Sequence, residues 1–353
     1  MYTSISAFKY ITPFILYVLS LLAFQGNGLI CYAPLLYTFF AVPILELFIK
    51  ASSTNLDEVE ESLAKQNKLY DFILYAAVIM QYYSLWIFVN SLQAPSLSTA
   101  TIIGRVISMG LLCGTFGINV AHELGHRVNK MEQTFAKMLL LTSLYMHFFI
   151  EHNKGHHKHV ATAADPSTAK YNQSLYAFWP QTLIGTYKSA WKIAGEEAVK
   201  KGQSLFSLRN EMLLFQIIQL LFLLGIFILF GLTTTLLFMV AALMGGLLLE
   251  SVNYIEHYGL TRNETENHQF ERVQPHHSWN SNHIIGRLML FELSRHSDHH
   301  YLASRKYQIL RSYENAPQMP TGYPGMILLS LVPPLWFKVM NNQMKKYNLI
   351  KAI

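Results

Sequence analysis

Histidine is the residue type in this sequence whose spacing suggests chemistry. Fifteen histidines occur among 353 residues, and many of them fall into short clusters. In the first cluster, HELGH, His122 and His126 are four residues apart, which on a helix places both imidazoles on one face. Such a pair is suited to a metal ion. The HExxH pattern of zinc proteases has the same spacing, but taken alone it is a weak signal.

Two further clusters and one histidine complete a larger set. The second cluster is EHNKGHH, the third is SRHSDHH, and the single histidine lies in NYIEHYGL. The nine candidate metal ligands are His122, His126, His152, His156, His157, His257, His296, His299 and His300. One zinc ion takes about four ligands, so this set is too large for a metalloprotease. Two metal ions explain it better, and imidazole ligands suit iron as well as zinc, copper or nickel.

The neighbours of these clusters have two interpretations each. Acidic residues adjoin the candidate ligands and are either solvated charges or acceptors for an imidazole N–H; they are Glu123, Glu151, Glu256 and Asp298. The histidines of QPHHSWNSNH are His276, His277 and His283, for which we favour roles around the ligands or at the substrate entrance. The single residues His147, His159 and His268 are interpreted as ordinary interfacial histidines.

The composition indicates a membrane protein. Hydrophobic residues make up 52% of the chain and charged residues 14%, against roughly 45–50% and about 25% in soluble domains. The net charge of +6 is explained by a positive-inside topology rather than by nucleic-acid binding. Cys31 and Cys113 both lie in apolar runs, so no disulfide framework or iron–sulfur cluster is expected. Any electrons must therefore come from another protein.

Six apolar runs are long enough to cross a bilayer core of about 30 Å as helices. They cover residues 8–24, 29–49, 69–92, 98–120, 211–231 and 234–252. The predicted fold is therefore all-α, a multi-pass membrane protein with a single membrane-embedded domain over residues 1–353. Residues 135–150 are predicted to form an interfacial or buried helix, and residues 326–340, interrupted by Pro333 and Pro334, a membrane-surface segment.

The positions of Lys and Arg predict the orientation. The breaks at 25–28, 93–97 and 231–233 contain neither residue, so both termini and the catalytic segments 121–209 and 253–353 are expected on the cytoplasmic side. HELGH and His257 each follow a span that ends on that side. A metal transporter would place its ligands near the bilayer midplane, so we disfavour it. Arg105, inside the fourth span, needs a partner or a water-lined niche.

The motifs HELGH, EHNKGHH, NYIEHYGL and RHSDHH, in this order, resemble those of the integral-membrane alkane 1-monooxygenases, within the membrane fatty acid desaturase and hydroxylase superfamily. The resemblance covers about residues 121–311 and includes the phrase RVQPHHSWNSNH. It implies a six-helix bundle in the inner (cytoplasmic) membrane and two iron ions held by the nine histidines. It further implies O2-dependent hydroxylation of alkanes to 1-alkanols, with electrons from rubredoxin and its reductase. A xylene-type hydroxylase and an acyl-lipid desaturase or hydroxylase remain alternatives.

The sequence departs from the family where the substrate is expected. It has Arg127 after HELGH and Tyr301 after RHSDHH, where the family commonly has Lys and Ala. Leu47 replaces a bulky Trp of the family, so we expect it to border the substrate channel. Further wall candidates, for which plain helix packing is the alternative, are Leu111, Leu112, Phe116 and residues 247–249, which include Leu248.

The last expectation concerns the electron donor. Basic residues near the histidine clusters are expected to attract a small acidic carrier. They are Lys154, Lys158, Arg295, Arg305, Lys306 and Arg311. The alternative is that they reflect only the positive-inside bias of membrane proteins.

Overall fold

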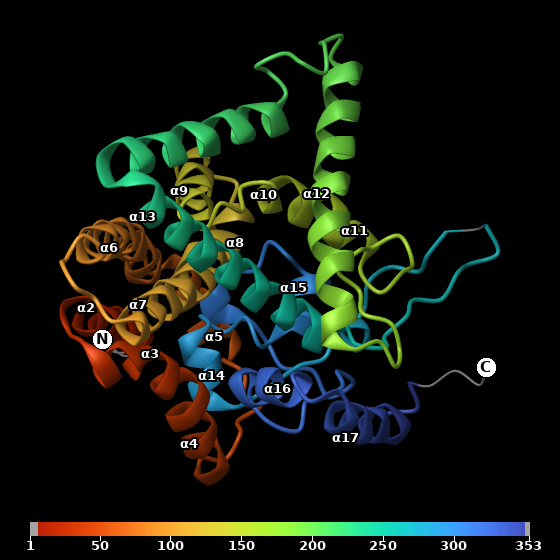
Figure 1. Cartoon of the computed structure of the whole chain (residues 1–353). Coiled ribbons are helices and arrows are strands. Elements are labelled where there is room, and N and C mark those ends of the chain that lie inside the picture. The colour runs from red at the N-terminus through yellow and green to blue at the C-terminus, as the bar shows by residue number, and fades with distance from the viewer. Residues whose placement is uncertain (1–5, 268, 350–353) are drawn as a thin grey trace.

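The computed structural model describes residues 6–267 and 269–349, and over these residues the chain is helical (Figure 1). Within them, β structure is limited to two isolated bridges, Glu264 with Phe270 and Asn280 with Gln318. The predicted all-α class is confirmed. His268 lies outside the described residues.

Among the described residues, five helices are long and apolar enough to cross a membrane. The first is Phe8–Gln25, which contains α2 (Ile15–Gln25), and the second is Gly28–Phe48, which ends in α4 (Val42–Phe48). They are followed by α6 (Leu69–Ser91) and by Thr99–Gly125, which joins α7 (Thr99–Leu112) to α8 (Asn119–Gly125). The fifth is α13 (Glu211–His257).

Helix α13 covers both of the last two predicted spans. Gly231 interrupts it with φ 80° and ψ 172°, so its two halves run in different directions (Figure 1). A positive φ of this kind favours glycine, which has no Cβ. The predicted ranges 211–231 and 234–252 therefore correspond to the two halves of one bent helix. The number of membrane crossings stays a prediction.

Helix α7–α8 lies at the centre of the bundle, because 83% of its most apolar stretch is buried. Glycines let the second half of α13 approach it closely. A Cβ added at Gly245 would lie 2.5 Å from the Cβ of Cys113, and one at Gly110 would lie 2.8 Å from the Cβ of Met244. Small residues allow such contacts between helices in membranes. The two helices that carry HELGH and His257 are thereby held side by side.

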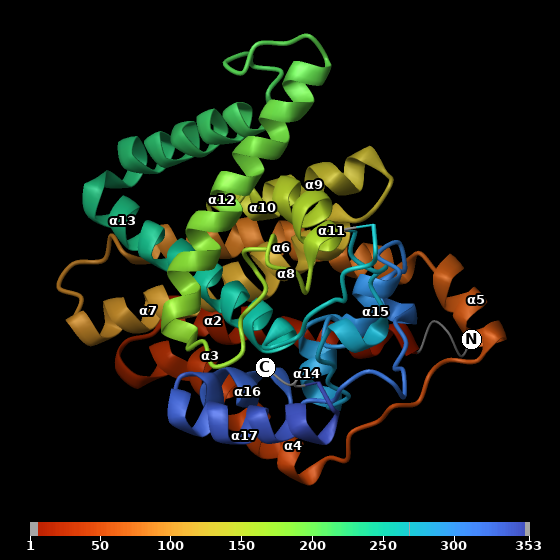
Figure 2. The same ribbon diagram turned by 90° about the vertical axis from the view of Figure 1, so that its right-hand side faces the viewer.

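Short helices surround the ends of these spans. They are α5 (Glu58–Gln66), α9 (Lys130–Leu141), α10 (Phe148–Glu151), α11 (His157–His159), α14 (Ile284–Met289), α15 (His296–Tyr301), α16 (Tyr323–Ser330) and α17 (Pro333–Lys346). The region predicted as one helix at 135–150 is two helices separated by a turn. Figure 2 shows α12 (Leu175–Lys200) and the first half of α13 extending away from the other helices.

Arg105 finds its partners on two backbone carbonyls and one side-chain amide. Its Nη1 donates to the carbonyl of Ser91 at 2.6 Å, and its Nη2 donates to the carbonyl of Gly26 at 2.8 Å and to Asn27 Oδ1 at 3.4 Å. The guanidinium therefore fastens the turn between the first two spans to the end of α6. These contacts show how the charged side chain of Arg105 is stabilised inside an apolar span.

Candidate metal centre

The structure brings all nine predicted histidines together, in two groups. Within each group, the ring nitrogens that face one another lie within 4.8 Å. The five-histidine group is His122, His126, His152, His157 and His299. The four-histidine group is His156, His257, His296 and His300. His276, His277 and His283 belong to neither group.

Local helix geometry divides the clusters between the two groups. Residues 152–156 form a π-helical turn, in which residues five apart share a face. His152 and His157 therefore meet, with their Nε2 atoms 3.0 Å apart, whereas His156 faces the other group. On α15, His296 and His300 are one turn apart and join the four-histidine group, and His299 points to the five-histidine group.

The spacing of the nitrogens fits metal coordination. The Nε2 atoms of His122 and His299 are 2.9 Å apart, and those of His296 and His257 are 3.2 Å apart. Imidazole nitrogens lie about 2.0–2.1 Å from a zinc ion, so two such ligands at a right angle are about 3 Å apart. Each group thus has the spacing of adjacent ligands around one ion of similar size.

The protonation state of the imidazole rings also fits metal coordination. Burial lowers the pKa of His126 to about 3, with the nearby His156 as a second cause. Burial likewise holds the pKa values of His152 and His299 well below the ordinary value. These imidazoles are therefore neutral at physiological pH, as metal ligands must be.

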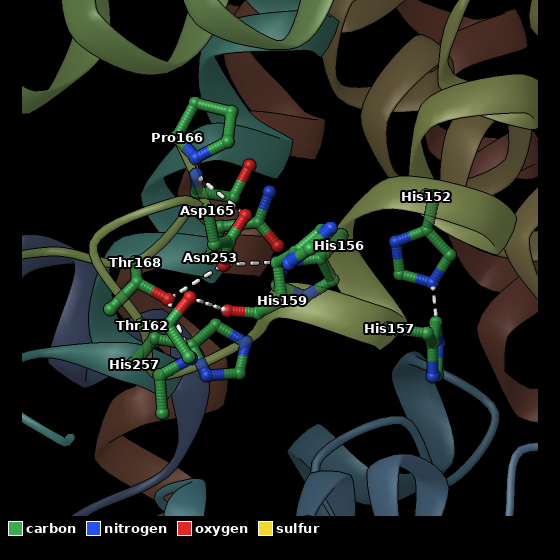
Figure 3. Close-up of polar contacts among 12 residues, drawn as sticks. His152, His156, His157, His159, Thr162, Asp165, Pro166, Thr168, Asn253 and His257 are labelled. Carbon is green, nitrogen blue, oxygen red and sulfur yellow. Dashed lines mark hydrogen bonds and ion pairs between the residues drawn. The ribbon is translucent and has the colours of Figure 1, made fainter. Parts of the chain in front are cut away.

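Asp165 orients one of the ligands. His156 Nδ1 lies 2.9 Å from Asp165 Oδ2, and the same carboxylate accepts hydrogen bonds from Thr168 Oγ1 at 2.6 Å and from the backbone N–H of Ser167 at 3.0 Å (Figure 3). Burial disfavours the charged ring, but the Asp165 carboxylate outweighs it and raises the pKa of His156. With Nδ1 donating to Asp165, Nε2 of His156 is left for the four-histidine group.

The four acids named from the sequence have different surroundings. Glu256 Oε2 lies 3.2 Å from His296 Nε2, and its Oε1 accepts a hydrogen bond from the Tyr323 hydroxyl at 2.6 Å. Glu123 instead accepts from Arg127 Nη2 at 2.5 Å, the arginine that follows HELGH in place of the family's lysine. Glu256 therefore lies beside the nitrogen of His296 that faces His257, so an acceptor role for the opposite N–H stays a prediction, and Glu123 holds Arg127.

Asp298 and Glu151 also differ from the expected acceptor role. Asp298 binds Arg305 Nη1 at 2.7 Å and the Tyr313 hydroxyl at 2.9 Å, and so fastens α15 to the following segment. The carboxylate of Glu151 is buried, which, together with the charge of Asp165, raises its pKa to about 8. Its Oε1 has no hydrogen-bond partner among the described residues.

The remaining clustered histidines have local partners. His277 Nδ1 accepts a hydrogen bond from the backbone N–H of Gln274 at 3.0 Å, and its Nε2 lies 3.4 Å from Glu271. The ring of His276 lies against that of His277, with the centroids 4.2 Å apart. His283 Nδ1 lies 3.0 Å from Ser281 Oγ. These contacts stabilise the segment between α13 and α14.

An apolar cavity of about 40 Å³ lies beside the metal centre. Its walls come from the second span, α13, the end of α14 and α16, and include Val42, Leu248, Leu290 and Tyr323. Of the predicted channel residues, Leu248 lines this cavity. Leu111 and Phe116 are buried, and Phe116 stacks on Tyr17 with ring centroids 4.1 Å apart, so they belong to the packed interior.

Leu47 does not line this cavity, and its position beside a substrate channel stays a prediction. Its side chain is 76% exposed on α4, whereas the preceding residue, Glu46, is 5% exposed and faces inward. One turn of helix separates Val42, which lines the cavity, from Glu46. The side chain that faces the interior at this end of the second span is therefore Glu46.

Most of the basic residues named for a carrier are engaged within the protein. Arg295 donates to the carbonyls of Leu310 and Thr54. Arg305 binds Asp298, Lys306 binds Asp71, Arg311 binds Glu61 and Lys154 binds Glu197. Because five of the six cations have internal partners, they do not form the free basic patch expected from the sequence.

A basic surface that includes two of these residues, Lys154 and Lys158, adjoins the metal centre. A cleft of about 1160 Å³ lies between α12 and the segment that follows α11. Six lysines line it: Lys154, Lys158, Lys170, Lys188, Lys192 and Lys200. Asp165, the partner of His156, also lines the cleft. One side chain therefore separates this surface from a histidine of the four-histidine group.

Comparison with known proteins identifies the family. The family model of fatty acid desaturases matches residues 96–330. Alkane 1-monooxygenase 2 of Pseudomonas aeruginosa is 39% identical over 314 residues, which cover 88% of this chain and 82% of the relative. Alkane 1-monooxygenase 2 of Alcanivorax borkumensis is 38% identical over 88% of this chain and 82% of its own length. The hydroxylase component of a xylene/toluene monooxygenase of Pseudomonas putida is 31% identical over 68% of this chain and 63% of its own length. With its histidine groups in place and these relatives matched along most of its length, the chain belongs to the fatty acid desaturase family and, within it, to the alkane 1-monooxygenases.

Proposed function

We propose that this protein holds two iron ions in its two histidine groups and uses them, with O2, to convert alkanes to 1-alkanols. The observation that carries the proposal is the convergence of nine imidazoles at the spacing of metal ligands. Histidine-rich sites suit iron. The matched alkane 1-monooxygenases supply the reaction and the substrate class.

Bound iron would supply the reductive activation of O2 and the attack on a strong C–H bond. The protein's own residues orient and enclose that chemistry. Asp165 fixes the tautomer and direction of His156. The Tyr323 hydroxyl donates to Glu256, whose other oxygen lies next to His296. Tyr323 also lines the apolar cavity, so this hydrogen-bonded pair links the cavity wall to the four-histidine group.

The apolar cavity of about 40 Å³ provides the position for the terminal carbons of the substrate. An alkane has no polar group to bind, so the shape of the walls must determine which carbon is presented. The lining side chains are apolar apart from Thr38, Thr115 and Tyr323, and they come from helices that are long enough to cross the bilayer as well as from α14 and α16. This placement favours entry of an alkane from the lipid.

Each turnover consumes one alkane, one O2, two electrons and two protons and gives one alkanol and one water. The electrons are proposed to come from rubredoxin, itself reduced by rubredoxin reductase. The lysine-lined cleft next to Asp165 and His156 is the surface where an acidic carrier would dock. Replacing Lys188 and Lys192 by Glu should raise the KM for reduced rubredoxin severalfold at low salt, with the KM for alkane unchanged.

We further propose that the protein lies in the inner membrane, crosses it six times and has its termini and metal centre on the cytoplasmic side. The Lys and Arg residues concentrate in segments 121–209 and 253–353, which also carry all nine histidines of the two groups. The bend at Gly231 allows the two halves of α13 to form two of the crossings.

Membranes that contain the protein should be assayed with octane, xylene and an acyl lipid, each with reduced rubredoxin and O2. The proposal predicts 1-octanol as the main product, at a rate that depends on the iron content. A preparation that hydroxylates xylene but not octane would establish the xylene-type alternative. Desaturation of the acyl lipid without alkane turnover would establish the desaturase alternative.

A further inference from the structure

Leu290 lies where the apolar cavity meets the metal centre. A second, smaller pocket of about 10 Å³ is lined by His122 and His299 of the five-histidine group and by Leu290. Leu290 also lines the apolar cavity of about 40 Å³. Leu290 therefore adjoins the apolar cavity as well as the pocket lined by two candidate metal ligands.

The small pocket does not admit a substrate as it stands. A cavity needs about 10–15 Å³ of such volume to hold one water molecule, so the pocket is at the lower limit for a single water. Leu290 is the residue that lines both cavities, so movement of its side chain would bring a methyl group in the apolar cavity to His122 and His299. Leucine has alternative staggered rotamers, so a rotation of the side chain is sufficient.

The backbone around Leu290 is held in an unusual conformation. The two residues that follow it, Phe291 and Glu292, have φ values of 49° and 60°, although neither is glycine. Such left-handed conformations are unfavourable for residues with a Cβ and persist where the surrounding structure enforces them. Both residues are buried. The chain thus makes a sharp, strained turn directly after Leu290.

Two anchors enforce this turn. Asn119 Nδ2 donates to the carbonyl of Leu290 at 3.1 Å, and Asn119 lies one helical turn before His122 on α8. The Glu292 carboxylate accepts hydrogen bonds from the Tyr10 hydroxyl at 2.8 Å and from Arg287 Nε at 2.6 Å. The backbone of Leu290 is therefore tied to the helix that carries HELGH, while its side chain is only partly buried.

We propose that the Leu290 side chain is the gate between the substrate cavity and the histidine-lined pocket, and that it determines which carbon of the alkane is hydroxylated. The inference rests on the proposed function for its substrate class. Asn119 fixes the backbone of Leu290, so only the Leu290 side chain moves. When it rotates, it leaves enough space for a terminal methyl group. The rotated side chain still blocks the second carbon of the alkane.

The test compares Leu290→Ala with the volume-conserving Leu290→Met and with a matched control, Leu328→Ala. Leu328 is a leucine of α16 that is 38% exposed and lines neither of the two cavities. In octane turnover, Leu290→Ala should raise the ratio of 2-octanol to 1-octanol at least severalfold at equal iron content. Leu290→Met and Leu328→Ala should keep the product ratio of the unmodified protein.

A second readout needs neither iron nor turnover. In the iron-free protein, diethyl pyrocarbonate modifies accessible neutral imidazoles, and mass spectrometry gives the rate for each histidine. Leu290→Ala should speed the modification of His122 and His299 severalfold and leave that of the peripheral His159 unchanged. Where Leu290→Ala fails to fold, Leu290→Val provides the smaller side chain.

The two readouts separate the gate from the proposed function. Unmodified protein that makes 1-octanol, with the same product ratio and the same histidine reactivity in Leu290→Ala, would reject the gate. Faster modification of His122 and His299 in a protein that turns over no alkane would support the gate and reject the alkane reaction.

Discussion

At the scale of single residues, Asp165 is the acid that the metal centre depends on most directly. Its carboxylate binds His156 Nδ1 at 2.9 Å and is itself held by Thr168. Asp165→Asn keeps the shape of the side chain and removes its charge. Loss of such a partner typically lowers metal affinity about 10–100-fold. We therefore expect the variant to release iron from the four-histidine group at a lower chelator concentration.

The matched control for this prediction is Asp57→Asn. Asp57 is an exposed residue that caps α5 by accepting a hydrogen bond from the backbone N–H of Glu60 at 2.7 Å. In chelator titrations followed by iron analysis, this variant should release iron at the same chelator concentration as the unmodified protein. Equal iron retention in Asp165→Asn and Asp57→Asn would show that Asp165 has no influence on the metal.

The ligand histidines were predictable from the sequence and Asp165 was not, for a physical reason. Residues at i, i+3 and i+4 share a helix face, so the clusters mark these rings as candidate ligands, but this spacing did not predict that His156 and His299 separate from their neighbours. Asp165 reaches His156 through a loop, and no periodicity links two residues nine positions apart across a turn. His156 belongs to a different group from His152 and His157 because residues 152–156 form a π-helical turn, which the sequence does not reveal.

At the scale of elements, Glu46 connects three walls of the substrate cavity. Its Oε1 on α4 accepts a hydrogen bond from the backbone N–H of Gly286, on α14, at 2.7 Å. A Cβ at Gly322, just before α16, would overlap the Glu46 carboxylate. The glycine is therefore required for the close approach of α16 to the end of the second span.

Gly322→Ala should consequently destabilise the protein. The added methyl group must displace the carboxylate or the helix, and overpacking of this kind costs about 1–3 kcal/mol. Thermal unfolding in detergent measures the effect. Gly225→Ala is the control, because a Cβ at Gly225 on α13 has nothing within 4 Å. Equal unfolding temperatures for the two variants would contradict the close contact with Glu46.

The apolar runs in the sequence predicted the helices, but they did not predict which side of each helix faces the interior of the protein. The family resemblance predicts Leu47 at the substrate channel, because Leu47 stands where the family has a bulky Trp. In the structure, Glu46 faces the interior and Leu47 is exposed. The partners of Glu46 lie 240 residues away on α14, and such a tertiary contact overrides the local pattern.

At the scale of the whole molecule, the proposed topology places the loop of residues 201–210 and the turn at 93–97 on opposite sides of the membrane. Ser204 and Ser96 are both exposed, whereas the two natural cysteines are buried. In intact cells, a thiol reagent that does not cross the inner membrane should label Ser96→Cys and leave Ser204→Cys unlabelled until the membrane is permeabilised. Labelling of Ser204→Cys in intact cells would show that the orientation is the reverse of the proposed one.

The central claim is that the two histidine groups are two separate metal sites. The most direct test is the iron content of the purified protein and of one variant for each group. We predict about two irons per chain in the unmodified protein and about one in His152→Ala and in His300→Ala. We predict none in the double variant and two in the control His159→Ala, which changes a histidine outside both groups. A fully active protein that holds one zinc and no iron, or single variants that both keep two irons, would contradict this account.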